Sequence, residues 1–395
     1  MWLYQTGSGD ESEAVIQYVV KKVYEEYGNP ISLLRNKRVT RERIRKDLDI
    51  IFCKLFQIAE GSCPIDLGIS SKEIQYDKWT APARMDLALT YKCNLKCMKC
   101  YLGDANSKEL STEEWLRAYE TLWSLGIPQI VFTGGEPTLR GDIVELVSEA
   151  DEFVTGMVTN GTKLKHLAKG LKDASLDYVQ ITIESYDHQI HDQMTTVSGS
   201  HDLTVSGITE SLKAGLQVVT NTTLTRLNAD QFLATMLWLK GVGVTNIACN
   251  TLISSGRGTK LKTHEGLSDN ELQKLLRSAN ELALKERINL QWYSPTCYSM
   301  FNPIDLGFGI KQCSAAAHNM TIAPNGNVFP CQSWPNYVGN ILMDDWYSIW
   351  NHPTCIKLRT HSMKSQECSG CVFESSCGGG CPLDKSTRIA KGGLK

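Results

Sequence analysis

Three closely spaced cysteines offer the clearest chemistry in this sequence. Cys93, Cys97 and Cys100 form the pattern C-x3-C-x2-C shortly after the apolar run Met85–Leu89. Three thiolates suit three irons of a cubane 4Fe-4S cluster, and the fourth iron can then chelate an amino and a carboxylate group. The alternative is a zinc knuckle, but zinc normally takes four ligands and its knuckles use C-x2-C pairs. We therefore expect an iron-sulfur cluster with one open iron.

A second set of cysteines lies near the end of the chain. The pattern C-x12-G-x4-C is followed, after a gap, by C-x2-C-x5-C-x3-C; together they comprise Cys313, Cys331, Cys368, Cys371, Cys377 and Cys381. The N-terminus turns polar after its first residues and does not resemble a signal peptide, so clustered thiols indicate metal ligands rather than disulfides. A zinc ribbon built from the last four cysteines is the alternative, but it leaves Cys313 and Cys331 without a role.

The composition excludes several classes of protein. The chain has 395 residues, of which 42% are hydrophobic and 21% charged, as in a soluble globular protein. The formal net charge of -2 gives no global field that favours nucleic acid or an anionic membrane. No apolar run reaches the roughly 18 residues that span a bilayer. We expect a cytoplasmic protein with no membrane or nucleic-acid partner.

Strands alternate with helices from about residue 81 to 290, and this alternation positions the first cysteines. The expected strands are Met85–Leu89, Gln129–Phe132, Phe153–Val158, Tyr178–Ile183, Leu216–Thr222 and Thr245–Ile253. Helices are expected from Ser111, whose spacing to Glu114 fits a capping box, and over 230–240. This order predicts an α/β fold with a parallel sheet, and six units make a partial (β/α)6 barrel. The cysteine loop then lies at the carboxyl edge, where such folds bind ligands.

Two further regions flank the predicted barrel. Residues 1–80 form a helical region, with one helix from Glu13 and another over 40–59; the second has the apolar face Ile44, Leu48, Ile51, Leu55 and Ile58. Residues 291–395 form a cysteine-rich region in which the strand–helix alternation disappears. We expect this tail to lack a conventional core and to need cross-links.

The cysteine pattern after the first strand resembles that of the radical S-adenosylmethionine superfamily. The resemblance implies that Cys93, Cys97 and Cys100 hold the catalytic 4Fe-4S cluster and that S-adenosyl-L-methionine is bound. It also implies an external one-electron donor, similar to flavodoxin or ferredoxin. Reductive cleavage would then give a 5'-deoxyadenosyl radical that abstracts hydrogen from a substrate. The chain departs from the family at Lys99, where an aromatic residue is usual, and Tyr101 is the candidate to take over the adenine contact.

Further cofactor contacts follow from the same resemblance. In the family, a stretch such as Thr133, Gly134, Gly135 and Glu136 binds the amino group of the cofactor's methionine. The glycines let backbone carbonyls approach the ligand, and the carboxylate pairs with the ammonium. Residues after later strands would contact the ribose, the methionine carboxylate or a substrate carboxylate; they are Asn160, Thr182, Glu184 and Arg257. Polar residues at strand ends are also ordinary turn formers.

The tail resembles the SPASM domain, which holds two auxiliary 4Fe-4S clusters. The resemblance implies that the first is held by Cys313, Cys331 and Cys381, and the second by Cys368, Cys371 and Cys377. A further downstream cysteine, usual in the family, is missing here, so the second cluster has an open site, recruits Asp384 or Cys355, or is absent. Cys297 is the candidate fourth ligand of the first cluster. Three isolated cysteines, Cys53, Cys63 and Cys249, are expected to be buried apolar residues.

Enzymes with this module mostly modify peptides, which predicts oxidative crosslinking of a ribosomally made precursor peptide. The first region adds a basic run that could hold an acidic leader peptide; it comprises Arg35, Lys37, Arg38, Arg41, Arg43, Arg45 and Lys46. Its helices resemble the end of the winged-helix leader-binding domain of peptide maturases, although a solvated helix face also explains the charges. The alternatives are an enzyme that modifies a tetrapyrrole or another small-molecule cofactor, and a non-catalytic iron-sulfur electron-transfer protein. An electron carrier has no need of the Gly134–Glu136 edge.

Overall fold

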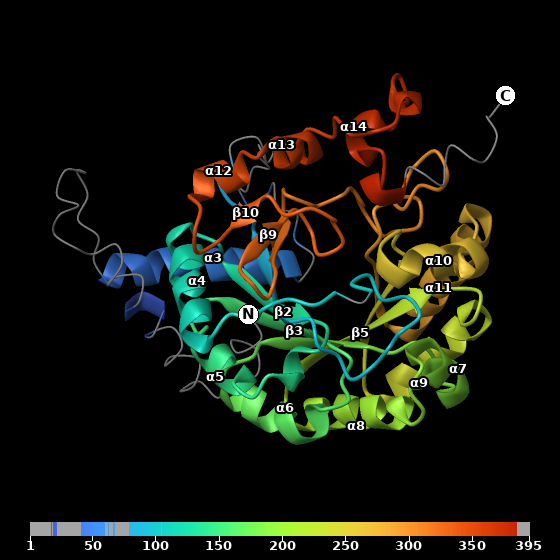
Figure 1. Cartoon of the computed structure of the whole chain (residues 1–395), viewed down its shortest axis with the longest axis horizontal. Helices are drawn as coiled ribbons and strands as arrows, with labels where there is room; N and C mark the ends of the chain where they lie inside the picture. Colours follow the sequence, from blue (N-terminus) through green and yellow to red (C-terminus); the bar gives the residue numbers. More distant parts are fainter. Residues whose placement is uncertain are drawn as a thin grey trace. The chain divides into compact units, whose positions relative to one another are not determined.

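The chain forms two compact units, Met1–Gln75 and Tyr76–Lys395. The computed structural model describes residues 41–59, 79–103 and 105–384, with residues 17, 19–21, 62, 66 and 67 (Figure 1). In the first unit, helix α3 (Arg41–Ala59) confirms the second predicted helix. Ile44 is buried on it, but Ile51 is 52% exposed, so the predicted apolar face does not extend to Ile51. Residues 17 and 19–21 are helical, and the rest of the first predicted helix lies outside the described residues.

The second unit is built on one sheet of ten strands among the described residues, in the order β10-β9-β8-β1-β2-β3-β4-β5-β6-β7. All six predicted strands are present; they are β1 (Arg84–Thr90), β2 (Gln129–Gly134), β3 (Val154–Thr159), β4 (Tyr178–Thr182), β5 (Gln217–Leu224) and β6 (Asn246–Thr251). Each is parallel to its neighbour in chain order, and β7 (Asn289–Trp292) adds a seventh. This is the α/β partial barrel that the sequence predicts.

Helices between the strands lie outside the sheet (Figure 1). They are α4 (Thr112–Ser124), α5 (Ile143–Ser148), α6 (Leu164–Asp173), α7 (His188–Thr195), α8 (Ser200–Lys213), α9 (Phe232–Val242), α10 (Gly256–Glu265) and α11 (Asp269–Glu286). The predicted capping box at Ser111 and Glu114 is present, with Ser111 Oγ accepting from the Glu114 backbone N–H. Helix α9 confirms the helix expected over 230–240 within two residues.

The tail does not lack a core, contrary to the expectation from its composition. Strand β8 (Asn319–Ile322) pairs in parallel with β1, and it continues into an antiparallel ribbon formed by β9 (Asn327–Phe329) and β10 (Gly339–Asn340). Met320, Ile322 and Val328 are fully buried in the same core as the barrel. The tail therefore extends the barrel sheet along the edge of β1. Helices α12 (Trp346–Trp350), α13 (Pro353–Arg359) and α14 (Glu374–Cys377) follow.

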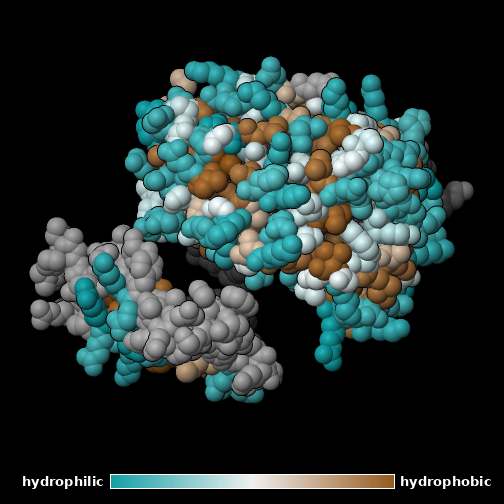
Figure 2. All heavy atoms as spheres, turned by 90° about the horizontal axis from the view of Figure 1, so that it is seen from below, coloured by the Kyte–Doolittle hydropathy of each residue, from teal (hydrophilic) through white to brown (hydrophobic). Residues whose placement is uncertain are grey.

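Figure 2 shows one face of the molecule coloured by hydropathy. Hydrophilic residues predominate there, and apolar residues form separate patches rather than one continuous area. Within the part of the chain that the structure describes, every helix is too short or too polar to cross a membrane.

Candidate active site and cluster ligands

The loop after β1 brings the first three cysteines together. Cys93 is exposed, whereas Cys97 and Cys100 are partly buried. Burial raises the pKa of Cys97 to about 12; Glu184, Cys93 and Cys100 also raise it, and Lys99 lowers it. Burial also raises the pKa of Cys93. Thiols grouped in this way need a nearby cation to stay deprotonated, and an iron-sulfur cluster supplies one. The donor set therefore fits a cluster bound through three cysteines.

The glycine loop after β2 is attached to the cysteine loop by backbone hydrogen bonds. Gly135 N–H donates to Thr90 O at 2.8 Å, and Glu136 N–H donates to Lys92 O at 2.8 Å. A Cβ on Gly135 would lie 2.3 Å from Lys92 O and 2.6 Å from Tyr91 O. Only glycine allows this approach, so the two motifs that the sequence analysis singled out are positioned by each other.

Glu136 connects the ends of β2 and β3 through its buried carboxylate. It accepts hydrogen bonds from Thr159 Oγ1 at 2.7 Å, from Asn160 N–H at 2.7 Å and from Thr138 N–H at 3.1 Å. Burial raises the pKa of Glu136, while these hydrogen bonds act in the opposite direction. Asn160 Nδ2 in turn lies 3.9 Å from Cys93 Sγ, beside the first cysteine. The contact of Glu136 with the cofactor's ammonium stays a prediction.

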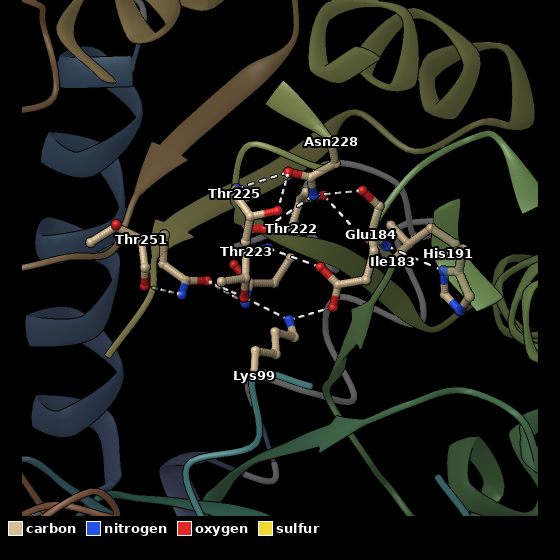
Figure 3. Close-up of polar contacts among 11 residues, drawn as sticks. Lys99, Ile183, Glu184, His191, Thr222, Thr223, Thr225, Asn228 and Thr251 are labelled. Carbon is tan, nitrogen blue, oxygen red and sulfur yellow. Dashed lines mark hydrogen bonds and ion pairs between the residues drawn. The ribbon is translucent and has the colours of Figure 1, made fainter. Parts of the chain in front are cut away.

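Lys99 forms a buried ion pair with Glu184 (Figure 3). The side chains are 14% and 0% exposed, and Lys99 Nζ also donates to Thr223 Oγ1 at 2.6 Å. The backbone around Glu184 is held as well: its N–H donates to His191 Nδ1 at 3.2 Å, and Asn228 Nδ2 donates to its carbonyl at 2.9 Å. Sequence reasoning missed this network, although a lysine in place of the usual aromatic residue is the signal for it.

Arg257 and Tyr101 hold the second half of the cysteine loop. The Arg257 guanidinium donates to Cys97 O at 3.0 Å and to Gly103 O at 2.8 Å. Tyr101 Oη donates to Gln332 Oε1 at 2.8 Å, which connects the loop to the tail. Burial raises the pKa of Tyr101. Their predicted contacts with a carboxylate and with adenine stay predictions, as does the contact of Thr182, which is half-buried at the end of β4.

A cavity of about 250 Å³ lies between the cysteine loop and the tail. Tyr91 and Tyr101 line it from the cysteine loop, and Phe329 and Trp334 line it from the tail. Gln332 and Ser333, directly after Cys331, complete its wall on the tail side. A group bound here would therefore lie between the first cysteines and Cys331.

Three tail cysteines assigned to one auxiliary cluster lie close together. Burial and the neighbouring Cys313 thiol raise the pKa of Cys331 to about 12. Burial, Asp384 and then Cys313 and Cys331 raise the pKa of Cys381 to about 12. These electrostatic contributions show that the three thiols lie near one another, and their binding of one auxiliary cluster stays a prediction.

Cys377, a member of the second set, lies beside Cys297, which the sequence analysis placed with the first set. Cys377, at the end of α14, accepts a hydrogen bond from Tyr298 N–H at 3.4 Å and donates to Thr296 O at 3.4 Å. A hydrogen bond with Cys297 also raises the pKa of Cys377. The structure thus places Cys297, the candidate fourth ligand of the first cluster, beside a cysteine of the second. Cys368 and Cys371 are partly buried in the preceding turn.

The remaining cysteines have other surroundings. Cys249 is buried, as predicted, but Cys53 is exposed on α3, because it lies on the outer side of that helix. Cys63 lies outside the described residues. Cys355 is fully buried in the apolar core.

Comparison with known proteins identifies the families to which these features belong. Residues 87–239 match the radical SAM superfamily, and residues 313–372 match the SPASM iron-sulfur cluster-binding domain. An AdoMet-dependent heme synthase from Methanosarcina barkeri is 25% identical over 76% of this chain and 91% of its own length. A PqqA peptide cyclase from Bradyrhizobium diazoefficiens is 25% identical over 76% of this chain and 81% of its own.

A solved structure gives the same fold. Streptococcus suis SuiB bound to the precursor peptide SuiA has a TM-score of 0.66 at 16% identity, covering 95% of this chain and 87% of SuiB. The fold and the two cysteine sets define an iron-sulfur enzyme that uses S-adenosylmethionine. The chain belongs to the SPASM-containing branch of the radical S-adenosylmethionine superfamily. Its cofactors are therefore a 4Fe-4S cluster, S-adenosylmethionine and auxiliary iron-sulfur clusters in the tail.

Proposed function

We propose that this radical enzyme introduces an oxidative crosslink, or a related modification, into a ribosomally made precursor peptide. The observation that carries the proposal is the cavity between the cysteine loop and the tail. At about 250 Å³ it lies below the roughly 300–1,000 Å³ of sites that enclose a drug-sized ligand. Such a cavity suits a single side chain of a peptide whose remaining residues lie outside it.

The residues around the cavity support this assignment. When bound, the cofactor and its cluster supply a 5'-deoxyadenosyl radical that removes a hydrogen atom. The aromatic side chains Tyr91, Phe329 and Trp334 orient a substrate group and keep water away from it. Cys331 directly precedes the cavity residue Gln332; an auxiliary cluster held by Cys331 would supply an acceptor for the electron left on an oxidised product.

Helix α3 is the proposed contact for the leader of the precursor. Arg41, Arg43 and Lys46 are exposed on it, and Arg43 Nε lies 3.9 Å from Asp47 Oδ2. Exposed cations attract an acidic peptide at low salt and lose that attraction as salt is raised. Replacing Arg41, Arg43 and Lys46 by Ser should weaken binding of a labelled acidic peptide, measured by fluorescence anisotropy, and leave 5'-deoxyadenosine formation intact. Replacing Lys165, Lys169 and Lys172 on α6 is the matched control.

Mass spectrometry tests the substrate class. The anaerobically reconstituted protein, with reductant and S-adenosylmethionine, is incubated with precursor peptides carrying acidic leaders or with tetrapyrroles. The proposal predicts a peptide product that has lost hydrogen and contains a new crosslink, together with 5'-deoxyadenosine. A second candidate, modification of a tetrapyrrole, is favoured by the similarity to the heme synthase. Modified tetrapyrrole with unchanged peptide would support that candidate and contradict ours.

A further inference from the structure

The second auxiliary set has three cysteines in the usual positions and lacks the usual downstream one. The structure describes the chain as far as residue 384, and the sequence after Cys381 contains no cysteine. Within the 395 residues, a fourth cysteine ligand comes from a position before the second set. The sequence suggests three candidates: Asp384, Cys355 and Cys297.

Asp384 and Cys355 are held by other contacts. Asp384 Oδ1 accepts from Lys262 Nζ at 2.7 Å and from Ser254 Oγ at 2.7 Å, which ties its carboxylate to the barrel side of the tail. Its neighbour among the cysteines is Cys381, which belongs to the first auxiliary set. Cys355 is 0% exposed on α13, inside the apolar core. Neither is placed to complete the second set.

Both sequence neighbours of Cys297 form hydrogen bonds with Cys377, a member of the second set. The residue before it, Thr296, accepts a hydrogen bond from the Cys377 thiol through its carbonyl, and the residue after it, Tyr298, donates its N–H to the same sulfur. The ring of Tyr298 also packs on Phe373, with centroids 6.2 Å apart. Phe373 lies between Cys371 and Cys377 in the sequence, so the segment that carries Cys297 is packed on the turn that carries the second set.

The segment that carries Cys297 is also firmly positioned. Thr296 Oγ1 accepts from Trp292 Nε1 at 2.9 Å, and Trp292 is a buried residue of β7. Tyr298 Oη accepts from Lys311 N–H at 2.7 Å. On the other side of the set, a Cβ added at Gly379 would lie 3.5 Å from Cys368 Sγ, so this glycine turn passes close to Cys368.

We infer that Cys297 is the fourth ligand of the second auxiliary cluster, in place of the missing downstream cysteine, together with Cys368, Cys371 and Cys377. The inference rests on the tail holding two clusters, and it does not depend on the substrate class. It leaves the first auxiliary cluster, on Cys313, Cys331 and Cys381, with a site free of cysteine.

The test isolates each auxiliary cluster in the full chain. Both backgrounds carry Cys93→Ala, Cys97→Ala and Cys100→Ala, which removes the catalytic cluster. One background adds Cys313→Ala, Cys331→Ala and Cys381→Ala, so that about four irons on the second set remain, as a cubane requires. The other adds Cys368→Ala, Cys371→Ala and Cys377→Ala, so that the first set remains. Cys297→Ala is then introduced into each, and iron, sulfide and the EPR spectrum of the reduced protein are measured.

We expect Cys297→Ala to lower the iron content or change the EPR spectrum only where the second set remains. A change in iron content or EPR spectrum only in the variant that keeps the first set would overturn the inference. So would the absence of iron from the variant that keeps the second set before Cys297 is replaced. Cys355→Ala is the matched control and should change neither spectrum.

If the multiple replacements prevent folding, Cys297→Ser in the otherwise wild-type chain gives an independent reading. Cys371→Ala identifies the signal of the second auxiliary cluster, and Cys331→Ala identifies that of the first. Cys297→Ser should shift the reduction potential of the second cluster. A shift in the reduction potential of the first cluster would contradict the inference. Peptide modification is assayed separately, so failure of the substrate proposal leaves this result unaffected.

Discussion

At the scale of single residues, Lys99 departs from the family pattern and forms a buried ion pair with Glu184. It replaces an aromatic residue and neutralises the carboxylate of Glu184 at the end of β4. A charge buried without a partner is far less favourable than one that is paired. Lys99 and Glu184 are therefore expected to act as a unit that positions the carboxyl end of the sheet near the cysteine loop.

Replacing Lys99 by Met should destabilise the protein by about 3–5 kcal/mol, because it leaves the Glu184 carboxylate buried and unpaired. Urea unfolding of anaerobic protein measures the change. Lys169→Met is the matched control: Lys169 pairs with Asp173 on the surface, and its loss should change stability by less than about 0.5 kcal/mol. Equal effects of the two replacements would show that the ion pair does not stabilise the site.

His191 should make the stability depend on pH. Burial, and then the nearby His201, lower the pKa of His191 to about 3, against an ordinary value of 6.5. Between these values the unfolded chain binds a proton that the native protein does not, so this contribution is complete above pH 6.5 and is lost as the pH falls towards 3. The slope from this group is at most about 1.4 kcal/mol per pH unit.

Asn at position 191 keeps a hydrogen-bond acceptor for the Glu184 N–H but does not titrate. His191→Asn should therefore flatten the decrease in unfolding free energy between pH 6.5 and 4. An unchanged slope in the variant would assign the pH dependence to other groups.

At the scale of elements, the Gly134–Glu136 loop and the cysteine loop are built against each other. Gly135→Ala places a Cβ against two backbone oxygens that have no side-chain freedom to move away. The two loops should separate, and S-adenosylmethionine cleavage should slow by about 100-fold, the cost of a misplacement of about 1 Å. The rate of 5'-deoxyadenosine formation measures this. Gly141→Ala, where nothing lies within 4 Å, is the control and should keep the wild-type rate.

Sequence reasoning predicted the barrel elements well and the tail elements poorly, for a physical reason. The strands β1 to β6 are apolar runs separated by helices, and this periodicity is visible in one sequence. The tail strands are only two to four residues long and lie among cysteines and prolines. Asn325-Gly326, with Gly326 at a φ of 86°, was a usable signal for the turn between β8 and β9. The parallel pairing of β8 with β1 is a long-range contact that no local pattern contains.

The site was predicted in part for the same reason. Spacing predicted the cysteine sets, and the family resemblance predicted the glycine loop, because both motifs are local in the sequence. The contacts of Arg257 with the cysteine loop, and of Cys297 with Cys377, join residues 80 or more positions apart. Such contacts depend on the packing of the whole sheet.

At the scale of the whole molecule, β8 adds the tail directly to the barrel strand that precedes the catalytic cysteines. The cavity, the cysteine loop and Cys331 are thereby parts of one continuous structure.

Iron and sulfide content of the reconstituted protein, measured with 5'-deoxyadenosine formation, tests this account most directly. The wild type should bind about twelve irons and the variant with Cys93→Ala, Cys97→Ala and Cys100→Ala about eight, since each cubane contains four. Only the wild type should form 5'-deoxyadenosine. About four irons in the wild type and none in the variant, with zinc bound in the tail, would contradict the auxiliary clusters on which the account depends.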